Sequence, residues 1–150
     1  MARAILRPDE CVLRHVTRTS RAVVNAFDAA LAPIGLTGSQ FNVLMSLDRG
    51  GPMTVSALAR HVGADPTTIP RTLRPLKLAK LVSSRPGADR REQLIAVTAT
   101  GHRRLAIARR RWTVVQRRIV EAIGRPSWIA LTRSLGAIRQ AARTRVNPAA

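Results

Sequence analysis

The chain has 150 residues, of which 26 are Lys or Arg and 8 are Asp or Glu, so its formal net charge is +18. An excess of this size attracts polyanions, and nucleic acid is the first partner to consider. The hydrophobic fraction of 45% argues against a disordered polybasic tail, and the length suits a single domain spanning residues 1–150.

The composition also limits other classes of protein. One cysteine and three scattered histidines provide neither a disulfide framework nor zinc-ligand spacing, so we expect no metal and no cofactor. Because no apolar run approaches the length of a membrane span and the first seven residues lack the apolar core of a signal peptide, we expect a cytoplasmic, nucleoid-associated protein without membrane contact.

The first 50 residues predict two helices. Apolar residues recur at three- and four-residue steps from Leu13 to Leu31, with Asp9 as the expected cap and Pro33 as the stop. Thr37 and Gln40 then have the spacing of a capping box, which predicts a second helix that ends near residues 50–51.

Residues 54–78 predict two short helices joined by a tight turn. Thr54 is expected to cap the first helix and Gly63 to end it. Asp65 as cap and Pro66 at the first helical position predict that the second helix begins at once and runs to about Leu78. This pattern is a candidate helix-turn-helix.

The period then changes to that of short strands. Residues 81–85 and 93–97 are predicted strands that bracket an exposed basic tip at 86–91, which is a wing. Thr98 is the expected cap of a long helix to about Ile123, and Ser127 the expected cap of a last helix. The apolar stripes of the first helix and the last two predict a helical interface between two copies of the chain.

Several segments together resemble the MarR family of regulators. They are the Leu-Thr-x-x-Gln-Phe start at 36–41, the run 67–76, the Asp-x-Arg wing at 89–91 and the Thr-x-x-Gly exit at 98–101. The resemblance implies a mainly α fold with a small β wing, in which residues 36–98 form the winged helix-turn-helix and residues 9–35 and 99–145 the helical dimerisation region. It implies a homodimer on a pseudo-palindromic operator, usually as a repressor. Pro70 departs from the family pattern and is expected to bend the first turns of the recognition helix.

The candidate DNA-binding residues lie in the second short helix and in the wing. The helix side chains are expected in the major groove, where Arg pairs with guanine and Thr reads polar edges or thymine methyls. An arginine of the tip is expected in the minor groove, held by Asp89. The set comprises Thr67, Thr68, Arg71, Arg74, Arg85, Asp89, Arg90 and Arg91.

The arginines of the long helix recur every seven residues and are expected to solvate its outer face, with a second DNA-contact surface as the alternative. They are Arg103, Arg110 and Arg117, and Arg104, Arg111 and Arg118.

Two sites are candidates for regulation. Cys11 lies at the expected start of the first helix, where Arg14 and His15 favour a thiolate and Asp9 and Glu10 oppose it. A structural cysteine is therefore favoured over a redox-active one, which stays the alternative. The resemblance also implies an effector, a small aromatic acid or an oxidant. The family analogy places an aromatic acid between the dimer helices and the winged module, near His15, Phe41, Met45 and Trp112.

The alternatives come from other classes of protein. A non-specific architectural or RNA-binding protein would suit the charge of +18 equally well and would show little preference among duplex sequences. An enzyme is not expected, because the sequence contains no acid/base pair, nucleophile triad or phosphate-binding loop.

Overall fold

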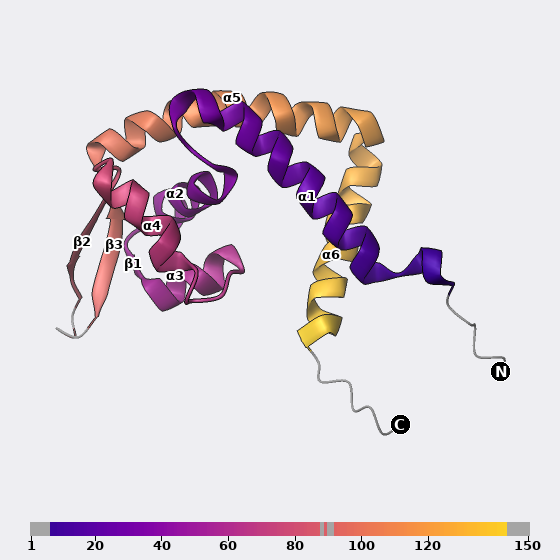
Figure 1. The fold of residues 1–150 in the computed structure, drawn as a ribbon, viewed down its shortest axis with the longest axis horizontal. Coiled ribbons are helices and arrows are strands. Elements are labelled where there is room, and N and C mark those ends of the chain that lie inside the picture. The colour runs from indigo at the N-terminus through magenta and orange to yellow at the C-terminus, as the bar shows by residue number, and fades with distance from the viewer. Residues whose placement is uncertain (1–6, 88, 90–91, 144–150) are drawn as a thin grey trace, which may run out of the picture. The chain divides into compact units, whose positions relative to one another are not determined.

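The computed structural model describes residues 7–87, 89 and 92–143 and forms two compact units, one up to Trp112 and one from Thr113. The fold is mainly helical with one small antiparallel sheet, as predicted (Figure 1). Its helices are α1 (Val12–Leu31), α2 (Gly38–Gly50), α3 (Val55–Val62), α4 (Ile69–Leu78), α5 (Ala99–Ile123) and α6 (Arg125–Arg143), with short 3-10 turns at Pro8–Glu10 and Ala32–Ile34. Its strands are β1 (Met53–Thr54), β2 (Val82–Pro86) and β3 (Gln93–Val97).

The predicted caps of α2 and α3 are confirmed. The Gln40 N–H donates to Thr37 Oγ1 at 3.2 Å, and Gln40 Oε1 accepts from the Thr37 N–H at 2.9 Å, which completes the capping box. Thr54 Oγ1 accepts from the third residue of α3, and Gly63 ends that helix at φ +71°. Glycine adopts this left-handed conformation without steric cost, so the turn toward α4 is tight.

The predicted start of α4 is wrong by three residues. The helix begins at Ile69, because an earlier start would require an N–H at position 70 to bond the carbonyl of Pro66, and Pro70 has none. Asp65 instead closes a turn, since its carboxylate accepts from the backbone N–H of Thr67 at 2.8 Å. Pro70 therefore lies in the first turn of α4, where a backbone N–H would have no acceptor within the helix, so the missing N–H of proline costs no hydrogen bond.

Two further caps differ from prediction. Asp9 belongs to the 3-10 turn before α1, whose N-cap is Cys11. Helix α6 begins at Arg125 rather than after Ser127, because Gly124 at φ +79° lets the chain reverse and start a new helix at once. The Trp128 N–H accordingly donates to the Gly124 carbonyl at 3.0 Å.

The sheet has the order β1-β3-β2, with both pairs antiparallel. Strands β2 and β3 pair as the wing, with Ser84 opposite Ile95. The two-residue β1 is an additional edge strand that the sequence did not predict. In the first unit, α2, α3 and α4 pack with the sheet and the start of α5 around one core. The fully buried side chains of this core are Leu31, Leu44, Leu58, Ile69, Leu76, Ile95 and Leu105.

The second unit contains the end of α5 and α6, and none of its described residues is buried. Helix α6 exposes four large apolar side chains, Ile129, Leu131, Leu135 and Ile138, of which the last three follow each other at steps of four and three. In the first unit, α1 likewise exposes Val12, Leu13, Val16 and Val24. Exposed apolar rows of this kind mark surfaces that bind another chain.

Candidate nucleic-acid interface

Helix α4 separates an apolar inner face from a cationic outer face. Ile69, Leu73 and Leu76 follow each other at steps of four and three and are buried in the core. Arg71 and Arg74 are exposed and three residues apart, so they share one outer face. Because α4 contains no acidic residue, this face presents an uncompensated positive charge to the solvent.

The two candidate threonines precede α4 in the turn that Asp65 closes. Thr67 donates its hydroxyl to the Asp65 carboxylate at 2.6 Å, and Thr68 donates its hydroxyl to the Asp65 carbonyl at 2.7 Å. The hydroxyl and then the backbone N–H of Thr67 lower the pKa of Asp65. Both threonines are exposed, at the entrance to the recognition helix rather than inside it.

The wing is the β2–β3 hairpin. Arg85 is exposed on β2 opposite Leu94, and the turn is closed by the Gly87 N–H on the Glu92 carbonyl at 2.8 Å. Asp89 is exposed in this turn, where its carbonyl accepts from the Glu92 N–H at 2.9 Å. Arg90 and Arg91 lie outside the described residues, so the expected Asp89–Arg91 contact stays a prediction.

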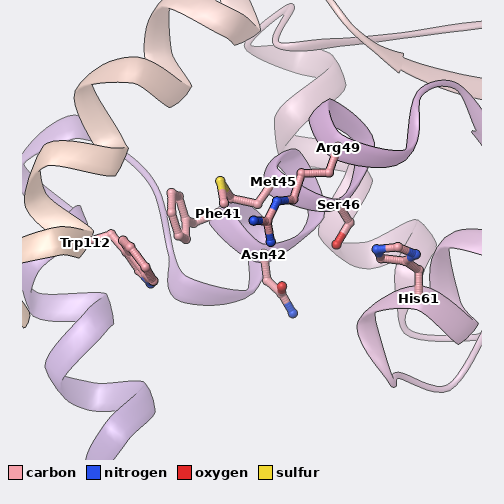
Figure 2. Close-up of a pocket in the computed structure, with 7 residues that line it drawn as sticks. All are labelled: Phe41, Asn42, Met45, Ser46, Arg49, His61 and Trp112. Carbon is pink, nitrogen blue, oxygen red and sulfur yellow. The ribbon is translucent and has the colours of Figure 1, made fainter. Parts of the chain in front are cut away.

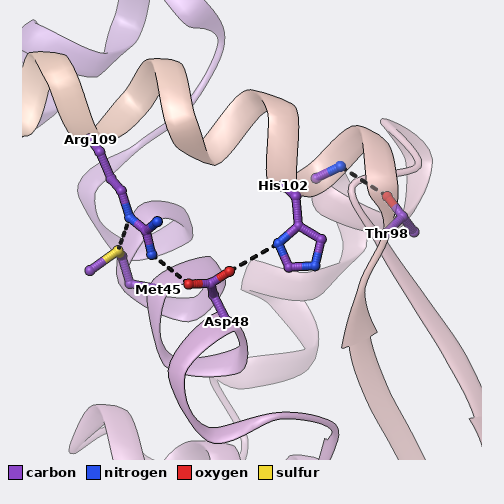
Figure 3. Close-up of polar contacts among 6 residues, drawn as sticks. Met45, Asp48, Thr98, His102 and Arg109 are labelled. Atoms are coloured by element: carbon purple, nitrogen blue, oxygen red, sulfur yellow. Dashed lines mark hydrogen bonds and ion pairs between the residues drawn. The ribbon is translucent and has the colours of Figure 1, made fainter.

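The start of α5 is fastened to the base of the wing. Thr98 donates its hydroxyl to the Lys80 carbonyl at 2.7 Å. Its hydroxyl oxygen also accepts from the Gly101 N–H at 3.0 Å, which is the cap predicted for this helix (Figure 3). Gly101 approaches the chain so closely that a Cβ there would lie 2.1 Å from the Leu81 carbonyl oxygen. The first turn of α5 is therefore held against the base of the wing.

Two arginines of α5 bind backbone carbonyls, and of these Arg104 is partly buried whereas Arg111 is exposed. Arg104 donates to the carbonyl of Ile34, and Arg111 to the carbonyl of Ala30 at 3.4 Å. These carbonyls belong to the last turn of α1 and the 3-10 turn that follows, where a cation is favoured by the helix dipole. The solvation predicted for Arg104 is therefore wrong, whereas Arg103 and Arg110 are exposed.

A hollow of about 290 Å³ opens between α2, α3 and α5, and Figure 2 shows its lining. A second hollow of about 260 Å³, toward α1, shares Phe41 and Trp112 with it. The Phe41 and Trp112 ring centroids are 6.2 Å apart at an interplanar angle of 31°. The first hollow is lined by Phe41, Asn42, Met45, Ser46, Arg49, His61 and Trp112.

Three of the four residues named for an effector site thus line one hollow, and His15 does not. The His15 ring nitrogen lies 2.5 Å from the Asp9 carbonyl oxygen in the turn before α1. Cys11 is exposed at the N-cap of the same helix, near His15 in sequence. The two candidate regulatory sites therefore lie on different parts of the chain.

The sequence missed the polar cluster that joins α2 to α5. Asp48 on α2 accepts from Arg109 and contacts His102, both on α5 (Figure 3). Partial burial raises the pKa of Asp48, but the hydrogen bonds and charges of Arg109 and then His102 outweigh this and leave it below the usual value. The partners lie 61 and 54 residues away, so no local spacing could indicate them.

The arrangement defines a winged helix-turn-helix protein with a cationic recognition helix. Residues 34–92 match the MarR family. The transcriptional regulator MosR of M. tuberculosis is 32% identical over 91% of this chain and 98% of that one, with a TM-score of 0.81, and its complex with DNA gives 33% and 0.78. The chain therefore belongs to the MarR family of transcriptional regulators.

Two other relatives agree with this placement. The transcriptional repressor CouR, solved on a 23-mer DNA duplex, is 26% identical over 91% of this chain and 99% of that one, with a TM-score of 0.81. The uncharacterised HTH-type transcriptional regulator YwoH of Bacillus subtilis is 30% identical over 87 residues, 58% of this chain. That match spans 64% of YwoH, less than two thirds of its length. Among the described residues, no helix is long and apolar enough to cross a membrane.

Proposed function

We propose that the protein is a sequence-specific regulator that binds double-stranded DNA as a homodimer and represses transcription at a pseudo-palindromic operator in the cytoplasm. The observation that carries this proposal is the outer face of α4, which exposes Arg71 and Arg74 without an acidic residue and lies in one unit with the wing. Similarity to MosR and CouR, both solved on DNA, supports it.

Each element has a distinct role in this proposal. Arg71 and Arg74 enter the major groove, where a guanidinium forms two hydrogen bonds to the edge of guanine. Thr67 and Thr68 contact base edges or thymine methyls at the entrance to the helix. Arg85 and an arginine of the tip, Arg90 or Arg91, follow the backbone into the adjacent minor groove, where the potential is most negative at A·T-rich steps.

A second copy supplies the second recognition helix. The exposed apolar side chains of α1 and α6 form the surfaces that the partner covers. Burial of these eight large side chains against a second copy would contribute hydrophobic free energy that a monomer lacks. Two-fold symmetry places the recognition helices about 34–36 Å apart, one turn of B-DNA, and the operator carries matching half-sites.

Selection of bound duplexes from a randomised library, followed by affinity measurements, tests the proposal. Arg71→Ala should lose about 1–3 kcal/mol at particular base pairs, because it removes contacts to a base edge. Arg91→Ala should weaken binding mainly where the flanks are A·T-rich. Equal losses on selected and shuffled duplexes for both variants would favour the architectural alternative.

For regulation, we infer that a small aromatic acid relieves repression by binding in the hollow beside Phe41 and Trp112. The two rings offer stacking surfaces, and Arg49 and His61, which line the same hollow, offer donors for a carboxylate. A panel of benzoates and cinnamates should release labelled operator from the native protein at lower concentrations than from Arg49→Gln. An unchanged concentration dependence in Arg49→Gln and Trp112→Ala would exclude this hollow.

A further inference from the structure

Asp48 is the meeting point of two side chains from one face of α5. Arg109 donates its Nη2 to Asp48 Oδ2, and the His102 Nδ1 lies 2.9 Å from Asp48 Oδ1 (Figure 3). The two partners are seven residues apart, which corresponds to two helical turns, so Asp48 holds α5 at two points along its axis. The Asp48 side chain is 20% exposed, whereas the side chains of Arg109 and His102 are 44% and 54% exposed, so solvent partly screens these contacts.

The two helices that Asp48 joins are each attached to one of the proposed DNA-binding elements. Helix α2 packs on α3 and α4, and its Leu44 shares the buried core with Ile69 and Leu73 of the recognition helix. The start of α5 contacts the base of the wing at Thr98 and Gly101. Helix α1, whose exposed apolar row we assign to the partner copy, belongs to the same unit as Asp48, so a change in the angle between α2 and α5 arises within the unit that holds this surface.

We propose that Asp48 is a positioning residue that sets the angle between the helix-turn-helix and α5, and thereby the spacing of the two recognition helices in the dimer. This inference rests on the proposed function, because a spacing exists only if two copies bind one duplex. Asp48 itself is not among the residues assigned to DNA, so it acts through Arg109 and His102.

The link also borders the hollow proposed for the effector. Arg109 donates its Nε to Met45 Sδ at 3.3 Å, and Met45 lines the hollow one helical turn before Asp48 (Figures 2 and 3). A molecule that displaces the Met45 side chain therefore disturbs the guanidinium that Asp48 binds. This gives the proposed regulation a physical route from the hollow to the spacing of the recognition helices.

The experiment compares the affinity for a selected operator with that for operators lengthened or shortened by one or two base pairs between the half-sites. The variants are Asp48→Asn and Arg109→Gln, which change the net charge in opposite directions and so shift the total DNA affinity in opposite directions. Arg110→Gln is the control, because Arg110 is exposed next to Arg109 and its loss changes the charge equally.

For the native protein we expect a preference of about tenfold or more for the correct spacing. Asp48→Asn and Arg109→Gln should both reduce it to about threefold or less, while Arg110→Gln leaves it unchanged. Because a purely structural or electrostatic role would scale all operators together, an unchanged preference in folded, dimeric Asp48→Asn and Arg109→Gln overturns the inference. If Asp48→Asn does not fold, Arg109→Gln and Arg109→Lys decide.

The same measurements distinguish failure of the proposed function from failure of the role of Asp48. If the native protein binds selected and shuffled duplexes equally, the proposed function fails and the inference falls with it. If the native protein discriminates but the variants keep its spacing preference, only the inference fails.

Discussion

Replacing Gly101 by Ala tests the close contact between α5 and the base of the wing. Helix propensity alone would make this substitution stabilising by about 1 kcal/mol, since Gly is among the poorest residues inside a helix. The structure predicts the opposite, because the new Cβ would lie 2.1 Å from the Leu81 carbonyl oxygen and 2.6 Å from Val97 Cγ1. The clashing oxygen belongs to the backbone and cannot turn away as a flexible side chain would, so the first turn of α5 must move by more than about 1 Å to reach ordinary contact distance.

The magnitude follows from what this movement costs. Overpacking costs about 1–3 kcal/mol, and loss of the 3.0 Å hydrogen bond from the Thr98 N–H to the Leu81 carbonyl costs about 1 kcal/mol. After the gain in helix propensity, Gly101→Ala should lower the free energy of unfolding by about 2 kcal/mol, or the Tm by about 4–8 °C.

Urea titration and thermal unfolding followed by circular dichroism, at one protein concentration for all variants, measure this loss. Gly136→Ala in α6 is the matched control, because nothing lies within 4 Å of its new Cβ, and it should gain about 0.5–1 kcal/mol. A loss at Gly136 would instead indicate that a partner chain covers this residue. A Gly101→Ala variant as stable as the native protein would refute the close approach.

Three further predictions address assembly, redox chemistry and pH. Leu135→Glu, which places a charge on the exposed apolar row of α6, should convert a micromolar dimer into a monomer in sedimentation, and a stable native monomer would contradict the dimer. Peroxide should weaken operator binding reversibly in the native protein and not in Cys11→Ser if Cys11 is a redox sensor; identical responses would leave the small-molecule effector as the regulator. Asp48→Asn should lower the free energy of unfolding by up to about 1 kcal/mol above about pH 4, and the difference should vanish as the pH falls through the lowered pKa of Asp48; a difference that persists in acid would contradict the role of the carboxylate.

Features governed by neighbours in sequence were predictable. Thr37 and Gln40 satisfy each other's backbone groups three residues apart, and Gly63 ends α3 because of its own backbone freedom, so both could be read locally. The same local reasoning failed where two signals competed. Asp65 and Pro66 indicate a helix start, but Pro70 four residues later removes the hydrogen bond that such a start requires.

For the candidate site, too, the sequence predicts what depends on near neighbours and misses what depends on distant ones. The exposure of Arg71 and Arg74 follows from the period of α4, which sends Leu73 and Leu76 inward. The partners of Asp48 and Arg104 depend instead on how α5 crosses residues more than 50 positions earlier, and that crossing is set by the packing of the whole core. From the sequence, the regularly spaced arginines of α5 therefore predict a solvated face, although Arg104 and Arg111 bind backbone carbonyls.

The most direct test of the central claim is the ratio of two affinities, measured in about 0.15 M salt. The first is the affinity of the native protein for a duplex selected from a random library, and the second is its affinity for the same duplex with the base order shuffled. A sequence-specific dimer predicts a ratio of at least about 10³. A ratio near one at every salt concentration would show that the charge of +18 alone binds DNA, and would contradict the proposed function.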